Sequence, residues 1–157
     1  MKEEEDPNRV SFENDKNARD DELSSYQDEC VDLNFKGLTI YKYYFPIMTS
    51  KVIPIHKIKN INLIELNRIN GKYTFFGLSW KLIYYHLDKK RPIKTHAITL
   101  EEEDNSITIG ITPENPKKCF NVLRYLMTHM KNNNKEFEPL YQDSEKELLK
   151  SGKQKLD

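Results

Sequence analysis

The hydrophobic period of this chain changes once, shortly after Ile111. From Phe35 to Ile111, short runs of β-branched and aromatic residues alternate with turn residues, a pattern typical of an antiparallel sheet protein. The pair Asn70–Gly71 predicts a tight turn within this region. We expect up to seven strands, at residues 35–44, 51–55, 58–66, 73–76, 80–87, 94–102 and 107–111.

A helical period follows the last predicted strand. Asn115 is suited to cap a helix and Pro116 to occupy its first position. The apolar residues Phe120, Leu123 and Met127 then recur at helical spacing. A helix with such a stripe has to dock on an apolar surface, and only the preceding sheet is large enough. The sequence therefore predicts a mainly β domain with one C-terminal helix.

Charge divides the chain into three parts. Residues 1–32 carry four basic and twelve acidic side chains, residues 33–131 carry sixteen and seven, and residues 132–157 carry five and six. Residues 1–32 have too few apolar side chains to offset the entropy of ordering, so we expect a disordered acidic leader. Residues 132–157 are expected to be a charged tail, in which Ser144 and Glu147 have the spacing that starts a short helix. The basic part, 33–131, is the expected folded domain and the part that attracts anions, which the leader would screen.

The two cysteines and the lack of long apolar runs favour a cytoplasmic location. Cys30 and Cys119 are too few and too far apart in the sequence for a disulfide framework, which favours a reducing environment. The N-terminus lacks the apolar core of a signal peptide, and no apolar run approaches the roughly 20 residues of a membrane span. We expect a cytoplasmic protein whose contact with membranes is at most peripheral.

Three stretches resemble pleckstrin-homology-like (PH-like) domains. They are "YYFPIMTSKVIPIHKI" (43–58), the strand with Trp80 that ends in "LDKKRP", and "ITIGITPENPKKCFNVL" (107–123). Together with the element order, they make residues 33–131 similar to the small PH-like domains of many uncharacterised proteins. The resemblance implies a partly open barrel of about seven antiparallel strands in two sheets, capped by one C-terminal helix. In lipid-binding members of the family, the head group lies at the open end.

Two lysines match the basic motif of those lipid-binding members. Lys42 occupies its first basic position and Lys51 its second, whereas Ile53 stands where the motif has an arginine. Strand parity also places Lys42 on the side of Ile40, and Lys51 on the side of Ile53. If the isoleucines point inward, both ammonium groups rim an opening, and a lysine suits phosphate as a compact point charge. The alternative is that both lysines cover the barrel end with their stems while their charged ends stay hydrated.

A second basic feature is the run Lys89, Lys90, Arg91 and Lys94. Near an anionic leaflet each base contributes about 1 kcal/mol, enough for weak attachment of the protein. The alternative interpretation is an ordinary solvated loop.

The aromatic turn between the first two predicted strands is a candidate membrane-contact loop. Tyr41, Tyr43 and Phe45 lie on the parity opposite to Ile40. Ile47 and Met48, which follow them, would enter a membrane interface together with these outward aromatic rings. The alternative is that the cluster packs under another loop or covers the edge of a sheet.

Catalytic and metal motifs are absent from the sequence. The four histidines show no metal-ligand spacing, and neither a phosphate-binding glycine loop nor a nucleophile elbow is present. No nucleic-acid-binding motif appears, and the acidic leader would compete with nucleic acid for the basic part. We expect a non-enzymatic module without cofactor or metal. Its partner is an anionic phospholipid of the phosphoinositide or phosphatidic acid type, or alternatively a protein that it binds as a scaffold.

Overall fold

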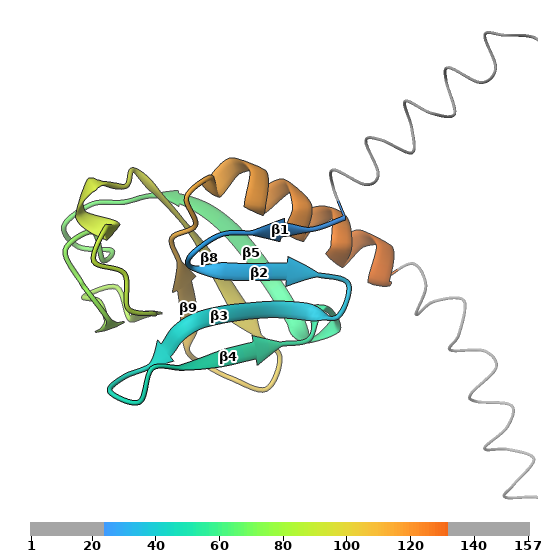
Figure 1. Cartoon of the computed structure of the whole chain (residues 1–157), viewed down its shortest axis with the longest axis horizontal. Helices are drawn as coiled ribbons and strands as arrows, with labels where there is room; N and C mark the ends of the chain where they lie inside the picture. Colours follow the sequence, from blue (N-terminus) through green and yellow to red (C-terminus); the bar gives the residue numbers. More distant parts are fainter. Residues whose placement is uncertain (1–23, 132–157) are drawn as a thin grey trace, which may run out of the picture.

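The structure is a computed structural model that describes residues 24–131. Within this range, nine strands form two sheets (Figure 1). The first sheet is antiparallel and contains, in spatial order, β1 (Tyr26–Gln27), β2 (Val31–Asn34), β3 (Gly37–Tyr44) and β4 (Thr49–Ile53). The second sheet has the order β5 (Ile58–Glu65), β8 (His96–Glu102), β9 (Thr108–Ile111), β7 (Ile83–Tyr85) and β6 (Gly77–Leu78). Two short 3₁₀ helices, η1 (Ile55–Lys57) and η2 (Arg91–Ile93), connect strands.

A helix from residue 116 to residue 131 packs against both sheets (Figure 1). The side-chain oxygen of Asn115 accepts a hydrogen bond from the Lys118 amide at 3.1 Å, which caps the first turn. The apolar stripe of the helix is buried in one cluster with residues of both sheets; its members include Leu33, Leu38, Ile40, Ile53, Ile98, Leu100, Ile109, Ile111, Val122, Leu123 and Leu126. The predicted class, mainly β with one C-terminal helix, is therefore confirmed.

The folded domain starts earlier than the sequence suggested. β1 and β2 lie largely within residues 1–32, the predicted disordered leader, and Tyr26 and Val31 are buried. The prediction treated Asp28 as one of the acids of a disordered leader, whereas it has a structural role. Its carboxylate accepts hydrogen bonds from the amides of Cys30, Val31 and Glu114, so it joins the start of the domain to the start of the helix. Residues 1–23 and the predicted tail 132–157, with its short helix, lie outside the described residues.

The predicted strand at 73–76 is absent, although the turn at Asn70 and Gly71 is present. The carbonyl oxygens of Thr74 and Phe75 accept hydrogen bonds from the side chain of Arg91 instead of from a neighbouring strand. The chain then pairs briefly as β6 with β7, and β7 pairs in parallel with β9. The second sheet therefore has one parallel pair, whereas the sequence predicted an antiparallel arrangement throughout.

Two glycines make room for the ring of Tyr85 on β7. A side chain at Gly71 or Gly110 would overlap this ring, and Gly71 also has a φ of 119°, which other residues rarely adopt. The Tyr85 hydroxyl donates a hydrogen bond to the Asn70 carbonyl at 2.7 Å. Tyr85 therefore fixes the Asn70–Gly71 turn to the second sheet.

We predict that Gly110→Ala lowers the free energy of unfolding by about 1–3 kcal/mol, the usual cost of overpacking a core. The added methyl group would overlap the Tyr85 ring and the Ile83 side chain. Urea denaturation of the variant and the wild type measures the difference. Gly77→Ala is a matched control for glycine replacement, because a methyl group added there would meet open space, although its φ of 84° adds backbone strain. A Gly110→Ala variant as stable as the wild type would contradict the packing described.

Candidate functional site

A β-bulge in β3 determines where Lys42 points. Ile40 pairs with Lys51, but the next paired residue is Tyr44, opposite Thr49, so β3 has more residues than β4 in this interval. Lys42 has a φ of 52° within the bulge. Tyr43 consequently takes the buried side and Lys42 the exposed side. The prediction that Lys42 shares the inward face with Ile40, and that Tyr43 lies on the outer face, is wrong for this reason.

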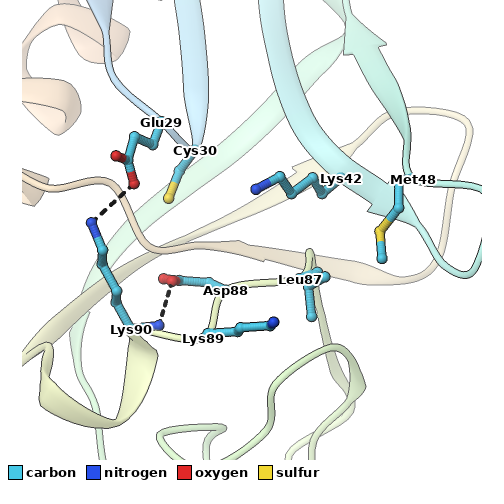
Figure 2. A pocket seen from close by; sticks show the side chains of 8 residues that line it. All are labelled: Glu29, Cys30, Lys42, Met48, Leu87, Asp88, Lys89 and Lys90. Carbon is cyan, nitrogen blue, oxygen red and sulfur yellow. Dashed lines mark hydrogen bonds and ion pairs between the residues drawn. The ribbon is translucent and has the colours of Figure 1, made fainter.

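Lys42 and Lys89 line a cavity of about 430 Å³ (Figure 2). Lys42 extends from β3 over one side of the cavity toward Cys30, and Lys89 extends along the other side (Figure 2). Neither lysine forms an ion pair with any residue in the described part of the chain. The remaining lining comes from Glu29, Cys30, Met48, Leu87, Asp88 and Lys90.

Lys51 does not line this cavity. Its ammonium group forms an ion pair with Glu102 of β8 at 3.1 Å, and lies 5.7 Å from the centre of the Tyr43 ring. The side chain is only 15% exposed. Lys51 therefore joins the two sheets. The structure does not bring it together with Lys42 as a pair of cavity-lining cations.

Arg91, predicted as part of a basic surface patch, is completely buried. Its guanidinium donates hydrogen bonds to the carbonyls of Thr74, Phe75 and His86, and lies 4.4 Å from the centre of the Tyr85 ring. Burial lowers the pKa of Arg91 to about 10, which leaves it charged at neutral pH. Arg91 is thus a structural cation that a ligand does not reach.

Lys94 is also an internal cation. Its ammonium group lies 2.9 Å from a carboxylate oxygen of Asp88 and donates to the Thr112 carbonyl at 2.5 Å. The Thr112 hydroxyl donates to the same carboxylate at 2.6 Å. Burial by itself would raise the pKa of Asp88, but the hydrogen bonds from Thr112 and Lys94 hold it below its ordinary value. Asp88 and Lys94 form a fixed ion pair with little net charge.

A cluster of possible metal ligands surrounds this ion pair. One ligand atom each of Cys30, His86 and Asp88 lie within 4.8 Å of one another, a grouping that the distant positions in the sequence did not reveal. The cation already next to them is Lys94, whose nitrogen is 3.6 Å from the Cys30 sulfur. Burial also raises the pKa of the Cys30 thiol to about 11, so it is protonated at neutral pH. We interpret the cluster as a polar network built around Lys94.

Lys90 is exposed but paired. Its ammonium group lies 3.0 Å from Glu29 and 3.7 Å from Glu114. Of the six predicted basic residues, Lys42 and Lys89 are therefore the two that face the cavity without an anionic partner among residues 24–131.

The predicted membrane-contact loop is exposed and borders an apolar groove. Phe45, Ile47 and Met48 are all exposed, and the Phe45 ring stacks on that of Phe76 at 4.1 Å between centroids. The groove, of about 480 Å³, is lined by Phe45, Met48, Phe75, Phe76, Leu87 and Lys89. Phe75 and Phe76 were missed as site residues because their apolar run was interpreted as a strand.

The apolar groove and the basic cavity are adjacent. Three residues, Met48, Leu87 and Lys89, line both of them. A ligand with an anionic part and an apolar part could therefore contact both hollows at once.

Comparisons with protein-family models, with curated proteins and with solved structures found no match to this chain. No helix within residues 24–131 combines the length and the apolar character that crossing a membrane requires.

His86, in the polar network, is almost completely buried. Its Nε2 atom accepts a hydrogen bond from the Thr112 amide at 3.3 Å, while Nδ1 has no partner in the described structure. Burial, followed by the positive charge of Arg91, lowers the pKa of His86 to about 3. His86 is therefore neutral in the folded protein down to acid pH.

We predict that His86 makes the protein less stable as pH falls from about 6.5 toward 3. Over this range the unfolded chain binds a proton at His86 and the folded chain does not. The free energy of unfolding therefore falls by about 1.4 kcal/mol for each unit by which the pH is lowered. Urea denaturation between pH 4 and pH 6, for example at roughly half-unit steps, measures the slope. His86→Gln keeps an acceptor for Thr112 and should show a slope smaller by that amount. His56→Gln, at an exposed histidine, should keep the wild-type slope. Equal slopes for wild type and His86→Gln would contradict the prediction.

Proposed function

We propose that this chain is a non-enzymatic binding module of PH-like fold that docks on an anionic membrane surface as a peripheral protein. The observation that carries the proposal is the cavity with two lysines that have no ion-pair partner among the described residues. This cavity shares Met48, Leu87 and Lys89 with an exposed apolar groove. Peripheral binding depends on both attractions, because charge brings the protein to the leaflet and apolar side chains hold it there.

The charged half of this site suits a phosphate-bearing head group. Lys42 and Lys89 offer ammonium groups to which no carboxylate of residues 24–131 is bound. The two acids in the lining are already engaged, Glu29 with Lys90 and Asp88 with Lys94. A phosphomonoester, as carried by phosphoinositides and phosphatidic acid, is the ligand chemistry that we propose for the cavity.

The apolar half suits the interface between head groups and acyl chains. Phe45, Met48, Phe75 and Phe76 are exposed together on one side of the cavity. Exposed aromatic and aliphatic side chains next to basic residues are characteristic of surfaces that lie in a membrane interface. Ile47, at the tip of the β3–β4 hairpin, would enter first because it is more exposed than Phe45 and Met48.

The arrangement of elements is compatible with the PH-like interpretation. The helix packs at one side of the two sheets, and the β3–β4 hairpin projects at the opposite side (Figure 1). In the family, a lipid site lies away from the capping helix, between early strands. Lys42 retains the first basic position of the family motif, and in this proposal Lys89 takes the part that the motif assigns to its second base.

We predict that replacing Lys42 and Lys89 by glutamine weakens binding to anionic vesicles about 30-fold. Each base near an anionic leaflet contributes about 1 kcal/mol, and glutamine removes the charge while keeping most of the side chain. Sedimentation of the full chain with vesicles of phosphatidylcholine plus phosphatidic acid, or plus a phosphoinositide, measures the change. Soluble inositol phosphate as competitor distinguishes binding of the free head group from binding of the lipid surface.

The matched control is Lys36→Gln plus Lys59→Gln, which removes two exposed charges elsewhere on the domain. Lys36 lies at the opposite end of β3 from Lys42, in the β2–β3 turn. Equal weakening by both double variants would mean that total charge, and not this site, determines binding. Failure of the wild type to sediment with any anionic vesicle at low salt would contradict the proposal and favour a protein partner.

A further inference from the structure

The segment between Glu65 and Asp88 has an unusual surface. It contains no acidic residue, and its charged side chains are Arg68, Lys72 and Lys81. It also exposes seven large apolar side chains: Ile69, Tyr73, Phe75, Phe76, Leu78, Trp80 and Leu82. Ordinary protein surfaces mix charges of both signs and expose large apolar residues singly. A surface that combines bases with aromatic and aliphatic residues, and lacks acids, matches an anionic bilayer in both charge and polarity.

The most exposed part of this segment is a hydrogen-bonded hairpin tip. Leu78 of β6 pairs with Tyr84 of β7, and the turn between them is closed by the buried Ser79. The Ser79 amide donates to the Ile83 carbonyl and the Leu82 amide donates to the Ser79 carbonyl, both at 2.9 Å. The Ser79 hydroxyl accepts from the Ile83 amide at 3.2 Å. These bonds define the conformation of the tip without any contribution from Trp80.

The tip presents two large apolar side chains to solvent. Trp80 is 89% exposed and Leu82 is 66% exposed. Leu82 also has a φ of 58°, a left-handed conformation that costs a leucine free energy and that a glycine would adopt freely. Neither exposure nor strain helps the domain to fold. Backbone strain that persists in a structure is a reason to look for function at that position.

The tip is continuous with the apolar groove of the proposed site. Phe76, which stacks on Phe45, directly precedes β6. Trp80 follows Phe76 by four positions, so the two lie within about 14 Å even if the chain is fully extended. The β6–β7 tip therefore begins next to the aromatic residues that line the groove.

We infer that the β6–β7 tip is a membrane-insertion element that places Trp80 and Leu82 at the boundary between head groups and acyl chains of an anionic bilayer. The inference rests on the proposed function and adds the element that enters the lipid. A bilayer interface accepts a protruding tip without a preformed pocket, and a tryptophan ring is amphipathic enough to remain at that depth. Lys81, between the two apolar residues, would stay among the anionic head groups, because a lysine stem can lie in the interface while its charge stays hydrated.

Trp80 itself reports on the inference, because it is the only tryptophan of the chain. We expect its fluorescence emission to shift to shorter wavelength when the full chain is mixed with phosphatidylcholine–phosphatidic acid vesicles. Vesicles with brominated acyl chains should quench this emission, and vesicles of phosphatidylcholine alone should leave it unchanged at low salt. Sedimentation with unchanged emission and no quenching would overturn the insertion of Trp80 while leaving the proposed function intact. Absence of sedimentation with phosphatidic acid vesicles and with phosphoinositide vesicles would defeat both.

A pair of variants tests the same inference by affinity. Trp80→Ala should weaken vesicle binding about tenfold, which corresponds to roughly 1.4 kcal/mol. Phe35→Ala is the control, because Phe35 is exposed in the β2–β3 turn, at the opposite end of β3 from Lys42 and the Phe45 loop. Urea denaturation should show both variants as stable as the wild type, since both side chains are exposed. Equal vesicle affinity of Trp80→Ala and wild type would overturn the inference.

Discussion

The buried guanidinium of Arg91 is the interaction on which the proposed binding end depends. It is closed off from solvent and donates to carbonyls of Thr74, Phe75 and His86, which belong to two separate segments of the chain. Without these hydrogen bonds the Thr74 carbonyl would lose its partner in the described structure, and the Phe75 carbonyl would keep only the amide of Asp88. A buried cation left without such partners, or such carbonyls left without the cation, costs several kcal/mol. Arg91 thereby holds Phe75 and Phe76 at the groove.

The ion pair of Asp88 with Lys94 fixes the backbone that carries Lys89, which lines the cavity. Asp88 also accepts a hydrogen bond from the Lys90 amide at 2.9 Å, so the backbone on both sides of Lys89 is fixed. Lys89 is left as the residue of this turn whose side chain has no internal partner within the described structure. The buried charges of Arg91 and Lys94 thus determine where the free charge of Lys89 is presented. The basic run therefore contains two cations that stabilise the fold, Arg91 and Lys94, and two exposed cations that line the cavity, of which Lys90 is paired with Glu29.

Local patterns predicted some of these features and failed at others for identifiable reasons. Asn115 and Pro116 indicated the start of the helix because capping depends only on neighbouring residues. The exposure of Phe45, Ile47 and Met48 followed from their place in a hairpin turn. The prediction that Lys42 points inward was wrong because a β-bulge changes which residues of β3 face the core. The hydrophobic pattern of the sequence does not indicate this bulge. The burial of Arg91 could not be predicted, because it depends on hydrogen bonds to backbone carbonyls of residues distant in the sequence. Every residue has a backbone carbonyl, so the residue types give no signal of these bonds.

In the proposed binding mode, one end of the domain, formed by the Phe45 loop, the β6–β7 tip and Lys89, contacts the membrane. Hydrogen–deuterium exchange of the full chain, with and without phosphatidylcholine–phosphatidic acid vesicles, is the decisive test of this binding mode. We expect slower exchange in residues 44–49 and 75–90 on addition of vesicles, with unchanged exchange in the helix and in residues 101–107. Slower exchange along the helix with no change in residues 44–49 and 75–90 would contradict it.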